Sequence, residues 1–97
     1  MLTSKERSAL SALAQKIEPI FQIGKNGVTD VLKKELSDAL EARELIKISI
    51  QRNAELDAKS VLNELARELN AEPVSCVGFR IVLYRESSRN NIKHIEF

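Results

Sequence analysis

The stretch PIFQIGKNGVTDVLKKELSDALEARELIKISI, residues 19–50, decides the fold because it contains a strand, a helix and a second strand in one run. Residues 19–23 are branched and apolar, which favours a buried strand. Gly24-Lys25-Asn26-Gly27 is typical of a turn. From about Thr29 onward the leucines recur at helical spacing as far as Leu40. A unit of this kind predicts two parallel strands joined by a right-handed crossover.

The second strand of this run, Leu45–Ile50, alternates in a way that separates its two faces. Ile46, Ile48 and Ile50 point one way, whereas Lys47, Ser49 and Leu45 point the other. We therefore expect one sheet face to be packed and the other to be at least partly exposed to water.

The residues before this run predict an N-terminal helix. Thr3-Ser4-Lys5-Glu6 has the pattern of a capping box. An apolar stripe follows at helical spacing, made of Leu10, Leu13, Ala14 and Ile17. The helix should end before Pro19, because the residue ahead of a proline is disfavoured in helical geometry.

The residues after this run predict one more helix and a hairpin. Asn53-Ala54-Glu55-Leu56 is expected to open a third helix, and Asn70 is a suitable place for it to stop. Two strands are expected at residues 73–77 and 80–85. Because only Gly78 and its neighbour separate them, they should form an antiparallel hairpin.

The order of elements is helix, strand, helix, strand, helix, strand, strand. It predicts an α/β fold in which a four-stranded mixed sheet packs with three helices. Residues 1–86 are expected to form the domain and residues 87–97 a polar tail, whose end, residues 92–97, could dock or fray. Whether helices cover one face of the sheet or both stays open.

The composition is that of one globular domain. The chain has 97 residues, of which 43% are hydrophobic and 30% charged. Its formal net charge of +1 gives no argument for a nucleic-acid partner. It has one cysteine and no apolar run as long as a signal peptide or a membrane span. We therefore expect a cytoplasmic protein without membrane contact, with a monomer as the expected state.

Residues that could carry catalysis are scarce. The only histidine, His94, lies near the C-terminus. The only cysteine, Cys76, falls in an expected strand, where it should be a small buried hydrophobe. The glycines at residues 24 and 27 match neither nucleotide-binding glycine pattern. The sequence predicts that the chain is not an enzyme and takes no metal, cofactor or small-molecule substrate.

The turn Gly24-Lys25-Asn26-Gly27 has the features of an anion site. Glycines allow backbone N–H groups to approach a ligand closely, and the N-terminus of the following helix attracts negative charge. Lys25 adds a full positive charge, so a phosphodiester is the expected partner. The alternative is a simple tight turn, which two glycines at this spacing also form. Asp30 favours that alternative because it puts negative charge in the same helical turn.

Other basic residues could extend this site, namely Lys5, Arg7, Lys33, Lys34, Arg80 and Arg85. The competing interpretation is an ordinary charged surface with both signs interspersed. Aromatic residues are few and tryptophan is absent, so no base-stacking platform is indicated. Phe79 is expected to serve the core or the hairpin rather than to stack on a base.

The chain resembles the CRM domain (chloroplast RNA splicing and ribosome maturation), most closely its stand-alone bacterial YhbY-like form. The resemblance covers about residues 2–85 and consists of short matches in a fixed order. These are Leu2-Thr3-Ser4-Lys5-Glu6-Arg7, Pro19 followed by Ile23-Gly24-Lys25-Asn26-Gly27, Glu44-Leu45-Ile46-Lys47, and Gly78 followed by Val82-Leu83-Tyr84-Arg85.

The resemblance implies a fold similar to the C-terminal domain of translation initiation factor three. It implies RNA binding through the Gly24–Gly27 loop, with Arg7 and Arg85 at matching positions. It also implies association with the ribosomal RNA of the large-subunit precursor, as an assembly factor. The alternative is a protein-interaction module on ribosomal particles without RNA contact. One departure is that Phe79 stands where the family has a basic residue. Arg80 follows one position later, and a shift of one residue in a strand reverses the side chain.

Overall fold

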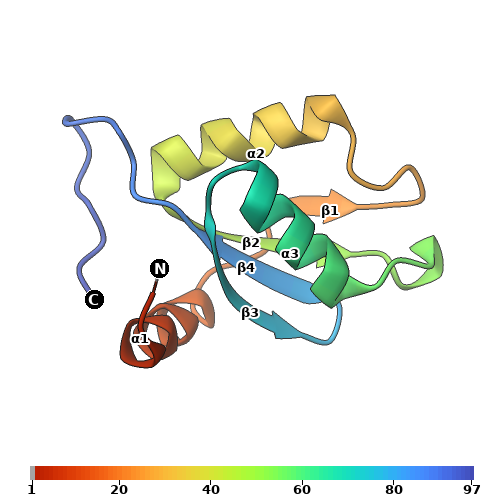
Figure 1. Ribbon diagram of the computed structural model, residues 1–97, viewed down its shortest axis with the longest axis horizontal. Helices are drawn as coiled ribbons and strands as arrows, with labels where there is room; N and C mark the ends of the chain where they lie inside the picture. Colours follow the sequence, from red (N-terminus) through yellow and green to blue (C-terminus); the bar gives the residue numbers. More distant parts are fainter. Residues whose placement is uncertain (1) are drawn as a thin grey trace.

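Two neighbouring strands, β2 (Leu45–Ile50) and β4 (Arg80–Tyr84), form the centre of the sheet (Figure 1). The computed structural model describes residues 2–97. β1 (Phe21–Ile23) pairs in parallel with β2, and β3 (Glu72–Val77) pairs antiparallel with β4. β2 and β4 are antiparallel, so the strand order is β1-β2-β4-β3. The α/β fold with a four-stranded mixed sheet is confirmed.

Three helices complete the domain: α1 (Ser4–Ala14), α2 (Asp30–Arg43) and α3 (Ala58–Glu68). The expected capping box of α1 is present. The Glu6 amide donates to Thr3 Oγ1 at 3.1 Å, and the Thr3 amide donates to Glu6 Oε1 at 2.9 Å. Thr29 caps α2 by accepting a hydrogen bond from the Leu32 amide. These caps satisfy backbone donors that a helix start would otherwise leave unpaired.

The third helix starts later than the sequence predicts, so the expected opening at residues 53–56 is wrong. A short 3-10 turn, η1 (Arg52–Ala54), comes first. Glu55 then adopts a left-handed conformation with φ of 59°, which ends that turn. Asp57 caps α3 by accepting from the Ser60 amide. At the other end, Asn70 is left-handed just beyond α3, as expected for a stop.

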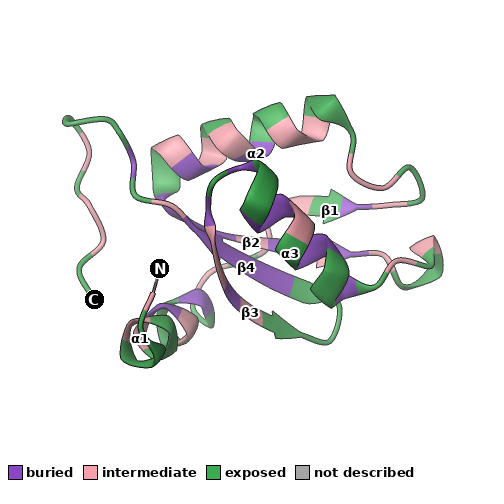
Figure 2. Ribbon diagram, viewed as in Figure 1, coloured by how far each residue is buried: buried purple, intermediate pink, exposed green. Residues whose placement is uncertain are grey.

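Helices cover both faces of the sheet. α2 and α3 pack on one face, with Leu36, Leu40, Ile46, Ile48, Leu65, Ile81 and Leu83 in the core between them. α1 packs on the other face through a smaller core of Leu10, Ala14, Leu45, Val74, Val82 and Tyr84. The buried residues accordingly run along β2 and β4 (Figure 2). The expected alternation in β2 is confirmed, because its isoleucines face α2 and α3 while Leu45 faces α1.

The C-terminal residues dock on the domain. The Ser87 and Ile95 amides donate to the two carboxylate oxygens of Glu44, at 2.8 and 2.7 Å. Ile95 packs against the smaller core, and the Phe97 ring meets Tyr84 edge-on with 5.2 Å between centroids. Of the two outcomes left open for residues 92–97, the structure shows docking, through Ile95 and Phe97.

Cys76 differs from the sequence expectation. It is exposed rather than buried, because it lies on β3, an outer strand of the sheet. Among residues 2–97, no group of three His, Cys, Asp or Glu side chains is placed to hold a metal ion. No helix in the same range is long and apolar enough to cross a membrane.

Candidate functional site

The loop Gly24–Gly27 projects from one end of the sheet, between β1 and α2 (right of Figure 1). The Gly27 amide donates to the Gly24 carbonyl at 2.9 Å and closes a tight turn. Gly27 has a φ of 68°, a backbone conformation that residues other than glycine and asparagine rarely adopt. Lys25 and Asn26 are exposed at the tip. The turn therefore presents one cation and one amide to the solvent.

The end of β2 supports this loop from the side. The Gln51 amide donates to the Ile23 carbonyl at 2.9 Å. The Gln51 side chain also lies against Gly24, where an added Cβ would come within 2.9 Å of Gln51 Oε1. Glycine at position 24 thus permits a close approach between two segments. α2 begins at Asp30, so the positive end of its dipole adjoins the turn.

The β3–β4 hairpin reaches the same end of the sheet. The Ile50 amide donates to the Phe79 carbonyl at 2.7 Å, which joins the end of β2 to the hairpin. The Arg52 guanidinium carbon lies 5.3 Å from the centroid of the Phe79 ring. Phe79 remains 38% exposed, so of the two roles expected from sequence, core or hairpin, it does not serve the core. Sequence reasoning missed Arg52, because nothing near it in sequence indicates its contact with Phe79.

Arg80 lies on the α1 side of the sheet, since it shares a strand face with Val82 of the smaller core. Its partner in the strand register is Ser49. With Lys47 it lines a small groove of about 210 Å³ between α1 and the sheet. The structure therefore places Arg80 at the loop end of the sheet, next to Phe79.

The two lysines of α2 differ in how free they are. Lys33 forms ion pairs with Glu68 and with Asp30, the latter at 3.8 Å. The hydrogen bond to Glu68 raises the pKa of the Lys33 ammonium above its usual value, although burial opposes this. Lys34 is 80% exposed and lies 3.4 Å from Asp38. Lys34 is therefore the more available of the two for an external anion.

Lys5 and Arg7 are exposed, but the structure does not bring them to the loop. They lie in the first turns of α1, whose neighbouring residues Leu2 and Glu6 share a hollow with Glu72 and Tyr84. Tyr84 ends β4, whereas the Gly24–Gly27 loop lies near the start of that strand. These two basic residues are therefore at the opposite end of the sheet.

Arg85 makes its contacts within the protein, whereas the sequence suggested a contact with RNA. Its guanidinium donates to the Leu69 carbonyl at 2.8 Å and to the Ser37 carbonyl at 2.9 Å. It also bonds Ser37 Oγ and the Glu41 carboxylate. The side chain is only 19% exposed, and its donors are directed at α2 and the end of α3. Arg85 therefore uses its donors within the protein.

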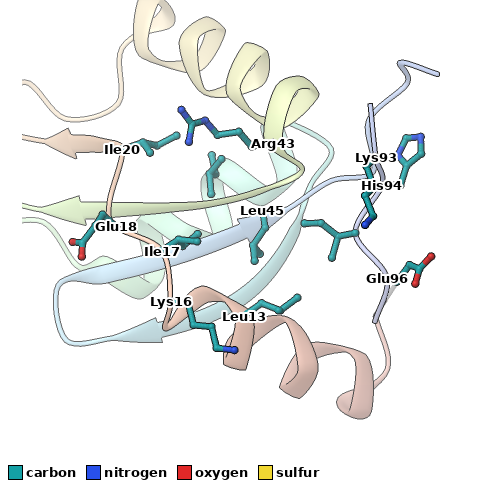
Figure 3. Close-up of a pocket in the computed structure, with 12 residues that line it drawn as sticks. Leu13, Lys16, Ile17, Glu18, Ile20, Arg43, Leu45, Lys93, His94 and Glu96 are labelled. Carbon is teal, nitrogen blue, oxygen red and sulfur yellow. The ribbon is translucent and has the colours of Figure 1, made fainter. Parts of the chain in front are cut away.

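An apolar cavity of about 830 Å³ lies at the end of the sheet remote from the loop. Leu13, Ile17 and Leu45 gather there between the last turns of α1 and the sheet (Figure 3). The docked C-terminal residues 93–96 form its other wall. Charged side chains also line this cavity, among them Lys16, Arg43 and Lys93 and the carboxylates of Glu18 and Glu96. Its apolar side chains suit contact with a hydrophobic group.

Comparison with known proteins identifies one family and relatives whose names agree with each other. The profile of the CRS1/YhbY (CRM) domain matches residues 2–85. YqeI of Bacillus subtilis (strain 168), named a probable RNA-binding protein, is 45% identical and is aligned over 99% of this chain and 98% of its own. A protein of Haemophilus influenzae named RNA-binding protein is 33% identical, over 95% and 93% of the two chains.

A solved structure shares both the fold and the sequence pattern. It is the solution structure of SAV1595 from Staphylococcus aureus, described as a hypothetical protein and a candidate for RNA binding. It superposes with a TM-score of 0.79 at 43% identity, covering 94% of this chain and 95% of that one. The mixed sheet with three helices is therefore a fold already seen in a close relative.

Proposed function

Because the chain belongs to the CRS1/YhbY (CRM) domain family, we propose that it binds RNA through the Gly24–Gly27 loop. The observation that carries this proposal is the exposed turn itself. It places Lys25 at the tip of the loop that leads into α2, at the end of the sheet where Arg52 and, on the α1 face, Arg80 also lie. A phosphodiester backbone suits such a surface, because it offers repeated negative charge without needing base contacts.

The names of the relatives support RNA as the partner over other anions. YqeI and the Haemophilus protein are both named for RNA binding, and each aligns over more than nine-tenths of this chain. The loop lacks the glycine spacing of nucleotide-binding motifs, which weakens a mononucleotide alternative. We infer a grip on the backbone that depends mainly on RNA shape.

At a finer level, we propose that the RNA is ribosomal RNA of the large-subunit precursor and that the protein assists its assembly as a cytoplasmic monomer. Support for this comes from the family resemblance. Crosslinking in cells followed by sequencing of the bound RNA tests it, with a concentrated signal in precursor large-subunit RNA as the expected result. A signal spread over unrelated transcripts would contradict the ribosomal role.

Lys25→Glu tests the loop. We expect weaker binding to a large-subunit ribosomal RNA transcript in a filter-binding assay. The slope of log affinity against log salt should fall by about 1, as for the loss of one phosphate contact. Lys93→Glu is the matched control, because Lys93 is exposed on the C-terminal segment beside the remote cavity. Equal affinity for Lys25→Glu and the wild type would remove the loop from the site.

The second candidate function is a protein-interaction module, and the cavity of Figure 3 is the observation that favours it. The two candidates respond differently to salt and nuclease. RNA-mediated association with ribosomal particles should be lost after nuclease treatment and at high salt. Association that survives both treatments would favour the protein-interaction module.

A further inference from the structure

The pair formed by Arg52 and Phe79 has no evident role in holding the fold together. Phe79 is in neither hydrophobic core and is 38% exposed. Arg52 is also exposed and forms no ion pair within residues 2–97. Together they present an aromatic ring and a guanidinium, 5.3 Å apart and both open to solvent.

Backbone hydrogen bonds fix the place of this pair next to the Gly24–Gly27 loop. The Ile50 amide donates to the Phe79 carbonyl, and the amide of the next residue, Gln51, donates to the Ile23 carbonyl. The Ala54 amide closes the following turn onto the Gln51 carbonyl at 3.2 Å, which positions Arg52 between them. The Gly24–Gly27 loop and the Arg52–Phe79 pair are therefore both held by hydrogen bonds at the end of β2.

We propose that Arg52 and Phe79 form a stacking site for one unpaired base of the bound RNA, beside the loop that contacts its backbone. Every nucleobase has a π-face, and proteins stack unpaired bases on aromatic rings and arginine planes. Arg52 alone would suit a phosphate. Phe79 adds a flat apolar surface that a phosphate cannot use, and this favours a base.

This inference deepens the proposed function and depends on it. It also names the class of RNA that should bind best. A base can reach the pair only if it is unstacked from its neighbours, as in a bulge, a loop or a strand end. The preferred ligand is then a helical RNA with an unpaired nucleotide next to the backbone that the loop grips. Specificity for such a site would come from RNA shape combined with one stacked base.

The test compares two probes that differ in one feature. One is a fluorescently labelled RNA stem with a single bulged adenosine, and the other is the same stem fully paired. We expect the wild type to prefer the bulged stem. Phe79→Leu keeps an apolar side chain but loses the flat ring, so its affinity for the bulged stem should fall by about 10-fold. Phe79→Trp should retain the preference.

Lys25→Glu separates this inference from the proposed function. It should weaken binding of both stems equally, because both offer the same backbone. If wild-type protein binds neither stem nor ribosomal RNA, the proposed function fails. If Lys25→Glu weakens binding but Phe79→Leu binds both stems as the wild type does, only the stacking site is overturned.

A direct readout on the wild type guards against misfolding of a variant. With 2-aminopurine in place of the bulged adenosine, stacking on the pair should quench its fluorescence when the protein is added. Arg52→Lys keeps the charge but loses the plane, so it should bind with reduced quenching. Binding by the wild type without any change in fluorescence would overturn the stacking site.

Discussion

The Arg85 guanidinium shows how a single basic side chain can serve the fold rather than a ligand. Its planar array of donors reaches the Leu69 carbonyl after α3 and the Ser37 carbonyl within α2. Two helices that contact the same sheet face are thereby connected to the end of β4. A lysine ammonium presents its donors from one point and is poorly suited to bridge both carbonyls.

Replacing Arg85 by lysine should therefore destabilise the domain. We expect the free energy of unfolding to fall by about 2 kcal/mol, because backbone carbonyls shielded from water lose a charged donor. Urea unfolding followed by circular dichroism measures this. Arg7→Lys is the control, since Arg7 is exposed on α1 and should tolerate the change. Unchanged stability together with weaker RNA binding would instead show that Arg85 belongs to the RNA-binding surface.

At the level of elements, the Gly24–Gly27 loop depends on two glycines for different reasons. Gly27 needs its left-handed φ of 68°, and nothing lies within 4 Å of an added Cβ. Gly24 has an ordinary φ but lies against the flexible end of the Gln51 side chain. Substitution at Gly27 therefore strains the backbone, whereas substitution at Gly24 displaces a side chain.

Gly27→Ala should lower the free energy of unfolding by about 1 kcal/mol, the usual penalty for a left-handed alanine. Gly27→Asn should cost less, because asparagine tolerates this region better. Comparing the two by urea unfolding isolates the backbone term, since neither side chain meets a neighbour at its Cβ. Equal stability of the alanine and asparagine variants would show that the left-handed conformation is not enforced.

Sequence periodicity was sufficient for most elements but not for every boundary. The alternation of β2 and the capping box of α1 are local patterns, so elements with such signals were predicted well. The start of α3 was not predicted correctly. The sequence from Asn53 to Leu56 resembles the start of a helix, but in the structure Glu55 is left-handed and Asp57 caps α3 instead. Local competition of this kind is not visible in periodicity.

The candidate site was predictable only in part, because some of its contacts join residues that are distant in sequence. The loop at Gly24 could be identified from its own residues. The Arg52–Phe79 pair could not, because the two are far apart in sequence and meet only through the pairing of β2 with β4. Likewise, the internal acceptors of Arg85 lie on α2 and after α3, so nothing near Arg85 in sequence reveals them.

At the scale of the whole molecule, Glu44 holds the C-terminal segment against the domain. Its carboxylate is fully buried and accepts from the Ser87 and Ile95 amides and from His94 Nδ1, the last at 2.5 Å. Burial by itself raises the pKa of this carboxyl. The hydrogen bonds from His94 and the two amides outweigh burial, so the pKa of Glu44 lies below its usual value.

His94 shows the complementary change. Its hydrogen bond to Glu44 raises the pKa of the imidazole above its usual value of 6.5, while partial burial opposes the shift, and the charge of Glu86 adds to it. A raised pKa in the folded state means that protonated His94 stabilises the fold. That contribution is complete below pH 6.5 and is lost as the pH rises through the folded-state pKa. The contribution of Glu44 is present above its usual pKa of 4.5 and is lost as the pH falls below it.

Docking of residues 87–97 should therefore be strongest between pH 4.5 and 6.5, where Glu44 is ionised and His94 is protonated. We expect the melting temperature to fall as the pH rises from 6.5, and amide exchange at Ser87 and Ile95 to accelerate in parallel. His94→Asn can still donate a hydrogen bond near the Nδ1 position but does not titrate, so its difference from the wild type isolates the histidine. Curves of melting temperature against pH that run parallel for the two proteins would show that the ion pair does not hold the C-terminal segment. Convergence of the curves above the folded-state pKa of His94 would show that protonation of this single histidine couples pH to the docking of the C-terminal segment.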